Sequence, residues 1–263
     1  MKNVEWWSPK AGFFGNFYVN GDNSKKGYLI NNDQTLGERT LTEVNGVEKL
    51  LSLQPNAKIL DCPCGYGRHS IALAEKGYHV TASDINPIHL NIMSTNISAF
   101  HNRKISDRIL FNISDMRYLQ VSTEFDAVIN MFYSFGFFET DVENELVLRN
   151  FWKSLRPGGK FLMHTDVNLP RVLSGNYKTD EFRNLNSKNT LRIIDNYNPK
   201  TKRMNGEWII NGVSKQYSVR VYSKSEFIRI CLKVGFTSCV AYSNWQGNDY
   251  TEASEDMIIV ATK

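Results

Sequence analysis

Short apolar runs alternate with amphipathic stretches through the middle of the chain. The apolar runs at 58–61, 78–83, 125–130 and 155–162 are typical of buried strands. Apolar residues recur at helical spacing in the stretches before and after the first run, at 37–53 and 68–74. Because strands and helices alternate, we predict a doubly wound α/β fold with a mostly parallel, seven-stranded sheet.

The pattern changes toward the carboxyl end. The runs 191–197, 207–210 and 216–222 predict antiparallel strands, with turns at the Asn-Pro and Asn-Gly pairs of 198–199, 205–206 and 211–212. A capping box at Ser223-Lys-Ser-Glu226 begins a helix through Val234. Strands near 237–243 and 257–262 complete the main sheet. We therefore predict a β insertion on the substrate side over residues 165–222.

The first fifty residues have no strand or helix period until the helix that begins near Gly37. They interleave aromatic residues with glycines: Trp6, Trp7, Phe13, Phe14, Phe17 and Tyr18 with Gly12, Gly15, Gly21 and Gly27. This composition predicts an N-terminal cap or lid with a lead-in helix over residues 1–50, followed by one main domain over 51–263.

The most informative motif is Lys58-Ile-Leu-Asp-Cys-Pro-Cys-Gly-Tyr-Gly-Arg-His-Ser70, in which a strand leads into a tight turn and a helix. Asp84 follows at the end of the next strand, where a carboxylate can accept both hydroxyls of a ribose. A dinucleotide fingerprint requires glycine or alanine at the position of Ser70. The motif therefore favours a nucleoside cofactor without a pyrophosphate.

The segment Asp61-Cys-Pro-Cys-Gly-Tyr-Gly67 resembles the first motif of class I S-adenosylmethionine (SAM) methyltransferases, an acid, three residues and Gly-x-Gly. Elements similar to the family's later motifs follow in order at 110–116, 125–138 and 155–162. The Asn130-Met-Phe-Tyr-Ser-Phe135 loop is similar to those of bacterial small-molecule N- and O-methyltransferases. The resemblance implies a Rossmann-like fold with SAM as cofactor and S-adenosylhomocysteine as product.

The resemblance also implies which residues bind the cofactor. Asp84 would bind the ribose, Asp115 the adenine amino group, and Arg39 the carboxylate of SAM, although Arg39 is equally well explained as a solvated helix charge. The predicted cofactor-binding residues are Tyr18, Arg39, Asp61, Cys62, Gly65, Gly67, Asp84, Ile85, Asp115, Met116, Asn130 and Met131.

Three residues at the ends of the fourth and fifth strands are predicted to form the catalytic, acceptor-facing part of the site. These are Tyr133, His164 and Asp166. Side chains at these strand ends face the crevice in which open α/β sheets bind ligands. An ordinary, hydrogen-bonded strand histidine explains His164 equally well.

Charge and cysteine content exclude several classes of function. A net charge of +4 with 22% charged residues gives no strong electrostatic argument for a nucleic-acid or membrane partner. The four cysteines have neither disulfide nor metal-ligand spacing, which favours a reduced, cytoplasmic protein without a metal. The amino terminus lacks a signal peptide, and no apolar run reaches membrane-spanning length.

These observations favour methyl transfer from SAM to a nitrogen or oxygen of a small-molecule acceptor. Two alternatives remain open: methylation of a macromolecule such as tRNA, a protein or a peptide, and an enzyme that rearranges or cyclises SAM itself. The sequence determines neither the acceptor nor whether the protein is a monomer or a homodimer.

Overall fold

A computed structural model describes residues 5–22, 35–99, 103–120, 124–175, 177, 179–185 and 188–263. Within these ranges no helix is long and apolar enough to cross a membrane. The elements in chain order are α1 (Asn16–Asp22), α2 (Leu36–Leu51), β1 (Lys58–Asp61), α3 (Arg68–Glu75), β2 (His79–Asp84), α4 (Pro87–Ala99), α5 (Arg103–Ser106), β3 (Ile109–Ile113), the 3-10 helix Met116–Tyr118, β4 (Phe125–Asn130), α6 (Asp141–Ser154), β5 (Leu155–Thr165), α7 (Leu169–Leu173), β6 (Asp180–Asn184), β7 (Thr190–Asn198), β8 (Arg203–Ile210), β9 (Val213–Arg220), α8 (Lys224–Val234), β10 (Ser238–Tyr242) and β11 (Met257–Thr262).

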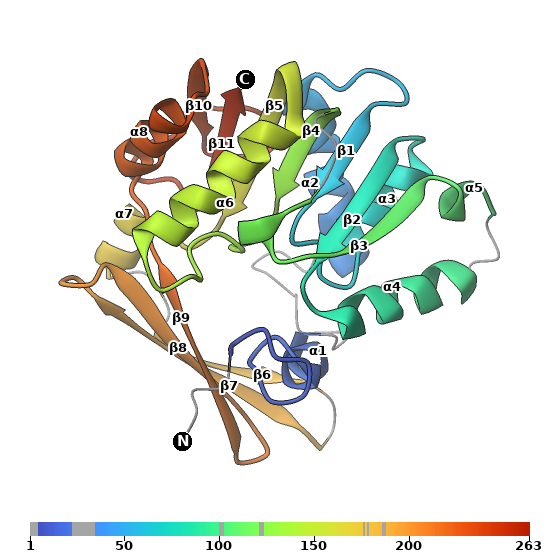
Figure 1. The fold of residues 1–263 in the computed structure, drawn as a ribbon. Helices are drawn as coiled ribbons and strands as arrows, with labels where there is room; N and C mark the ends of the chain where they lie inside the picture. Colours follow the sequence, from blue (N-terminus) through green and yellow to red (C-terminus); the bar gives the residue numbers. More distant parts are fainter. Residues whose placement is uncertain are drawn as a thin grey trace.

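The main sheet has seven strands in the order β10-β11-β5-β4-β1-β2-β3 (Figure 1). Strands β1 to β5 pair in parallel, whereas β11 is antiparallel to both β5 and β10. The prediction of a doubly wound, mostly parallel sheet is therefore confirmed. Because the parallel strands end at the same edge, the topology brings Asp61, Asp84 and Asn130 together there.

Helices cover both faces of this sheet (Figure 1). One core cluster joins β1 and β2 to α2, α3 and α4 through side chains such as Val47, Leu73 and Met93. The second joins β4 and β5 to α6 and α8 and includes Phe151 and Phe227, both fully buried. Two separate apolar layers therefore fix the strand ends that carry the candidate site.

A second sheet, β6-β7-β8-β9, is antiparallel and lies with α1 across the end of the main sheet (Figure 1). Buried Phe13 packs with Leu191, Ile193 and Trp208 of this sheet. The insertion predicted from the carboxyl-terminal pattern is therefore a real sheet, and the amino-terminal segment is packed on it. The predicted division at residue 50 falls at the end of α2 and stays a prediction, and residues 1–4 and 23–34 of the predicted cap lie outside the described residues.

The turn predicted at Asn205-Gly206 is wrong, because both residues lie inside β8. A Cβ atom at Gly206 would stand 2.1 Å from the ring of Tyr217 on the neighbouring strand. The glycine therefore makes room for an aromatic ring that crosses the strand, rather than forming a turn. The sequence pattern also did not predict β6 or α7.

Candidate functional site

Two cavities lie at the carboxyl ends of the parallel strands. The smaller measures about 100 Å³ and is walled by β-strand ends on one side and amino-terminal aromatic residues on the other. The larger measures about 670 Å³ and extends to the antiparallel sheet. Phe14, Tyr18 and Phe137 line both cavities, so the two are neighbours. The lining of the smaller cavity includes the predicted residues Tyr18, Cys62, Gly65, Asp84, Ile85, Asp115 and Met116.

The turn after β1 requires its two glycines. Gly65 and Gly67 have φ angles of 55° and 85°, in the left-handed region that favours glycine. At Gly67 a Cβ atom would lie 2.2 Å from the sulfur of Met93 in α4, so a larger residue would have to displace the Met93 side chain. Gly67 supports the turn from behind and does not line the cavity.

Asp84 is one of two carboxylates, with Asp115, that line the smaller cavity. One carboxylate oxygen accepts the Gly65 N–H at 2.9 Å, and the other accepts the Asn86 N–H at 2.8 Å. Each oxygen keeps a lone pair for another donor, because a carboxylate has about four acceptor sites. The Asn86 side chain donates to the carbonyl of Phe14 at 2.6 Å. The Asp84 carboxylate is therefore held in place by the glycine turn, and the same loop is tied to the amino-terminal segment; its contact with a ribose stays a prediction.

Asp61 and Asn130 lie behind the turn rather than on the cavity walls. Asp61 is buried and accepts the Ser70 hydroxyl at 2.6 Å. Burial raises the pKa of Asp61 to about 7. Asn130 donates its side-chain N–H to the carbonyl of Cys62 at 2.9 Å, and Met131 is buried in the core beside it. Their predicted cofactor contacts stay predictions; in the structure they hold the turn and the strand ends in place.

Asp115 and Met116 follow β3 and line the smaller cavity from the side opposite the turn. The Asp115 carboxylate accepts three hydrogen bonds from the Arg117 guanidinium, at 3.2, 3.1 and 2.7 Å. Arg117 also binds Glu143 at 2.7 Å and lies 4.3 Å from the centre of the Phe138 ring. This network was not predicted. It fixes the Asp115 carboxylate beside the place predicted for the adenine, whose contact with Asp115 stays a prediction.

Tyr133 and Asp166 line the larger cavity, as their positions at the ends of β4 and β5 predict. Tyr133 has a φ angle of 57°, and its backbone N–H donates to the carbonyl of His164 at 3.0 Å. Its hydroxyl oxygen is buried without a hydrogen-bond partner among the described residues. Burial raises the pKa of this phenol well above its usual value, with further contributions from nearby Tyr177 and Asp195. A buried hydroxyl without a protein partner is available to a ligand.

His164 lies behind the wall of the larger cavity. It is fully buried, its ring packs 4.9 Å from that of Trp245, and its Nε2 lies 3.5 Å from Asp256. Asp256, rather than His164, lines the cavity. Burial raises the pKa of Asp256, but the nearby His164 ring and the charges of Arg39 and Arg171 together bring it below its usual value. The contact between His164 and an acceptor stays a prediction; in the structure this histidine lies beside the Asp256 carboxylate.

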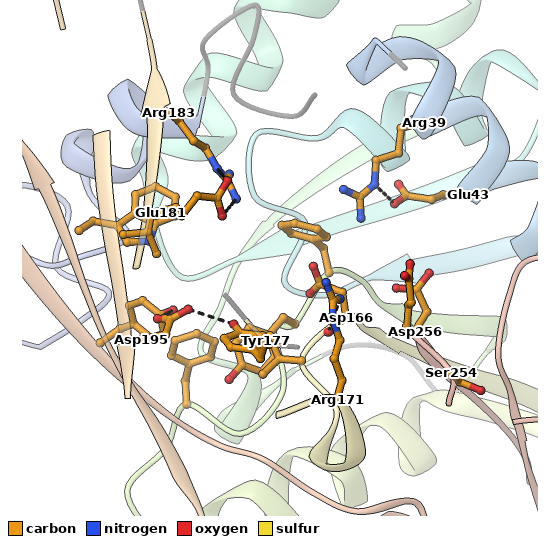
Figure 2. A pocket seen from close by; sticks show the side chains of 18 of the residues that line it. Arg39, Glu43, Asp166, Arg171, Tyr177, Glu181, Arg183, Asp195, Ser254 and Asp256 are labelled. Atoms are coloured by element: carbon orange, nitrogen blue, oxygen red, sulfur yellow. Dashed lines mark hydrogen bonds and ion pairs between the residues drawn. The ribbon is translucent and has the colours of Figure 1, made fainter. Parts of the chain in front are cut away.

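Arg39 belongs to a buried ion-pair group that lies across the larger cavity from Asp195 (Figure 2). Its Nε donates to Glu43 at 2.7 Å, and Glu43 also binds Arg68 and lies 2.8 Å from Nε2 of His69. Burial raises the pKa of Glu43, but the Arg68 charge and the His69 hydrogen bond bring it well below its usual value. Burial lowers the pKa of His69 to about 4, so this ring is neutral at pH 7. The interpretation of Arg39 as a solvated charge is therefore wrong, because its side chain is 13% exposed.

The antiparallel sheet, predicted as a substrate-side insertion, contributes a third wall whose polar residues the sequence did not reveal. Asp195 of β7 accepts the hydroxyls of Tyr177 and Tyr217 at 2.9 and 2.7 Å (Figure 2). The available signal was alternation: Leu191, Ile193 and Asp195 occupy successive inward positions of one strand. An aspartate at an inward strand position is unusual unless it is paired or functional.

Comparison with known proteins relates the central part of the chain to methyltransferases. Residues 59–159 match the family model described as a methyltransferase domain. YqeM of Bacillus subtilis (strain 168), a candidate methyltransferase, is 30% identical over 133 residues, 49% of this chain and 51% of the relative. The glycine/sarcosine N-methyltransferase of Parasynechococcus marenigrum (strain WH8102) is 31% identical over 48% of this chain and 44% of its own length. The chain thus spans about half the length of these two relatives.

A third relative aligns along nearly the whole chain. The glycine/sarcosine N-methyltransferase of Aphanothece halophytica is 25% identical over 255 residues, which are 95% of this chain and 91% of the relative. The CcbJ methyltransferase from Streptomyces caelestis has a TM-score of 0.69 at 14% identity and covers 84% of this chain and 89% of its own. SAM-bound CalS10, an amino pentose methyltransferase from Micromonospora echinaspora, has a TM-score of 0.64 at 18% identity, covering 87% and 92%. The predicted class I methyltransferase fold is confirmed.

Proposed function

Because residues 59–159 form a methyltransferase domain, we propose that this chain transfers a methyl group from SAM to a nitrogen or oxygen of a small molecule. SAM supplies a methyl group that its sulfonium already activates. The proposal rests on the two adjoining cavities. One is lined by Asp84, the carboxylate predicted to bind a ribose, and the other by polar side chains that would face the acceptor.

The residues of the smaller cavity fit the nucleoside part of SAM. Asp84 has acceptor capacity for the two ribose hydroxyls, and the glycine turn beside it leaves room for close approach. Met116 and Phe138 supply apolar walls for an adenine ring, with Asp115 at the edge. Arg39, on the wall of the larger cavity, would hold the carboxylate of the methionine part.

The larger cavity favours a basic acceptor, and nitrogen over oxygen. Its lining contains three arginines, Arg39, Arg171 and Arg183, and seven acids: Glu43, Asp166, Glu181, Asp195, Glu252, Glu255 and Asp256. The whole chain has the opposite sign, +4. An acidic cavity attracts an amine and repels the phosphates of nucleic acid. The Aphanothece protein is named a glycine/sarcosine N-methyltransferase and the Micromonospora protein an amino pentose methyltransferase. Both names agree with a nitrogen acceptor.

The chemistry requires the protein to orient the acceptor and to exclude water. As the new bond to the methyl carbon forms, the carbon–sulfur bond breaks, its electron pair stays on sulfur, and the nucleophile loses one proton. Positioning of the two reactants accounts for most of the rate in such a transfer. Tyr133 and Asp166 line the larger cavity, where the Tyr133 hydroxyl would orient the nucleophile and the Asp166 carboxylate would receive its proton.

Removing one of these polar groups should slow turnover without weakening SAM binding. We expect Tyr133→Phe and Asp166→Asn each to lower the rate by about 10- to 1000-fold, because positioning dominates the reaction. S-adenosylhomocysteine release in the presence of a small-molecule cell extract measures turnover, and calorimetry measures SAM affinity. Tyr118→Phe, at an exposed tyrosine, is the matched control. Full activity in both pocket variants would refute this assignment of the acceptor site.

A further inference from the structure

Asp195 is a buried carboxylate that neither the strand-end motifs nor the cofactor site explains. It projects from β7 into the larger cavity and is 6% exposed. Its partners are the hydroxyls of Tyr177, which lies between α7 and β6, and of Tyr217 in β9, which donate at 2.9 and 2.7 Å. Two neutral donors fix the position of the carboxylate and leave its charge uncompensated.

No lysine or arginine among the described residues forms an ion pair with Asp195. The charge of Arg183 lowers the pKa of Asp195, but Arg183 itself forms an ion pair with Glu181 at 2.9 Å. Burial raises the pKa of Asp195, as expected for a carboxylate without a counter-ion. Nearby Asp166 adds a like charge. Buried carboxylates are normally paired with a cation, so this one is prepared for a cation that arrives with a ligand.

Aromatic rings line the larger cavity together with this carboxylate. The Tyr217 ring lies 4.8 Å from that of Phe13 and 6.1 Å from that of Phe137, and Phe13 lies 5.2 Å from Trp208. Tyr133, whose buried hydroxyl has no partner within the described ranges, is 6.2 Å from Phe137. A carboxylate enclosed by aromatic faces is a typical site for an ammonium group, because ring faces also attract cations.

We propose that Asp195, held by Tyr177 and Tyr217, selects acceptors that carry an ammonium group and binds that group within the aromatic enclosure. The inference rests on the proposed function only in assigning the larger cavity to the acceptor. It makes the antiparallel insertion the specificity element, whereas the main sheet positions SAM. The unpartnered Tyr133 hydroxyl supplies a further hydrogen bond at the side nearest the strand ends.

The test compares a cation with a neutral molecule of the same shape. Benzylamine, protonated at pH 7.5, and benzyl alcohol are titrated into the full chain without SAM, and binding is measured by saturation-transfer NMR. We expect the wild type to prefer benzylamine by about tenfold or more, since a hydrogen bond to a charged group contributes about 1.5–3 kcal/mol. In Asp195→Asn the preference should fall at least about fivefold.

Three variants separate the charge of Asp195 from the fold around it, and Asp180→Asn is the matched control. Asp195→Asn keeps one oxygen that accepts from one tyrosine hydroxyl, and its amide N–H can donate to the other hydroxyl oxygen, so both contacts are retained while the charge is lost. Asp180→Asn removes an exposed carboxylate of the same sheet, paired with Arg192 at 2.6 Å, and should leave the preference unchanged. The double variant Tyr177→Phe, Tyr217→Phe should reduce the preference as well, because Asp195 is no longer oriented.

The outcomes separate this inference from the proposed function. Equal binding of the two probes by the wild type, or an undiminished preference in Asp195→Asn, overturns the role of Asp195. Neither result concerns SAM, whose binding is measured on the same proteins by calorimetry. Failure of SAM to bind the wild type would contradict the methyltransferase proposal and leave the ammonium site standing.

Discussion

Replacing Asp84 with alanine should lower the affinity of the chain for SAM by roughly 30- to 150-fold. The carboxylate is 5% exposed, lines the smaller cavity and keeps acceptor capacity for two ribose hydroxyls. Loss of such charge-assisted hydrogen bonds in a partly desolvated site costs about 2–3 kcal/mol. Isothermal titration calorimetry with SAM measures the change directly.

Two variants separate ligand binding from support of the turn. Asp84→Asn keeps one oxygen for the Gly65 or Asn86 N–H and should weaken SAM less than alanine does. Asp126→Ala, at the other end of the parallel strands, removes a carboxylate that pairs with Arg156 at 2.6 Å and should leave affinity unchanged. Unaltered SAM affinity in a folded Asp84→Ala protein would contradict the prediction that SAM binds in this cavity.

Glu43→Ala should destabilise the protein by about 3–5 kcal/mol, the typical cost of removing one partner from a buried ion pair. Glu43 is 1% exposed and compensates Arg39 and Arg68 while contacting His69. Chemical denaturation followed by circular dichroism measures the loss. Glu48→Gln on the same helix, paired at the surface with Lys76, should cost at most about 1 kcal/mol.

The stability lost on replacing Glu43 should become smaller as the pH falls. The pKa of Glu43 is well below 4.5 in the folded protein, so its stabilising contribution is present above about pH 4.5 and is lost as pH falls through the folded value. The stability difference between the wild type and Glu43→Gln should therefore narrow between pH 6 and pH 3. A difference that stays constant or widens would show that the carboxylate charge does not stabilise this group.

Local sequence signals predicted the part of the fold that follows from periodicity and turn chemistry. Apolar runs predicted the parallel strands, and the capping box at Ser223 predicted α8. Asp84 could be predicted as a ligand-binding carboxylate because it ends a strand and a glycine turn precedes it. Asn205-Gly206 misled the prediction, because the need of Gly206 to accommodate the Tyr217 ring arises from the neighbouring strand.

The acceptor wall could not be predicted because its residues come from distant parts of the chain. Asp195, Tyr177 and Asp256 meet only after the insertion folds over the strand ends. Glu43 lies at i+4 from Arg39, which resembles an ordinary surface pair, and only tertiary packing buries it. His164 was predicted correctly as a strand-end residue, but the side chain that reaches the cavity is that of its partner Asp256.

The most direct test of the proposed function follows the methyl group itself. The wild-type chain is incubated with SAM labelled with carbon-13 in its methyl group and with a low-molecular-mass cell extract, and the products are identified by mass spectrometry. We predict one labelled small molecule, an amine, formed in equal amount with S-adenosylhomocysteine and in much smaller amount by Asp84→Ala at a SAM concentration below the Kd of that variant. Consumption of SAM without any labelled acceptor, or label found only in added protein or RNA, would contradict the proposed function.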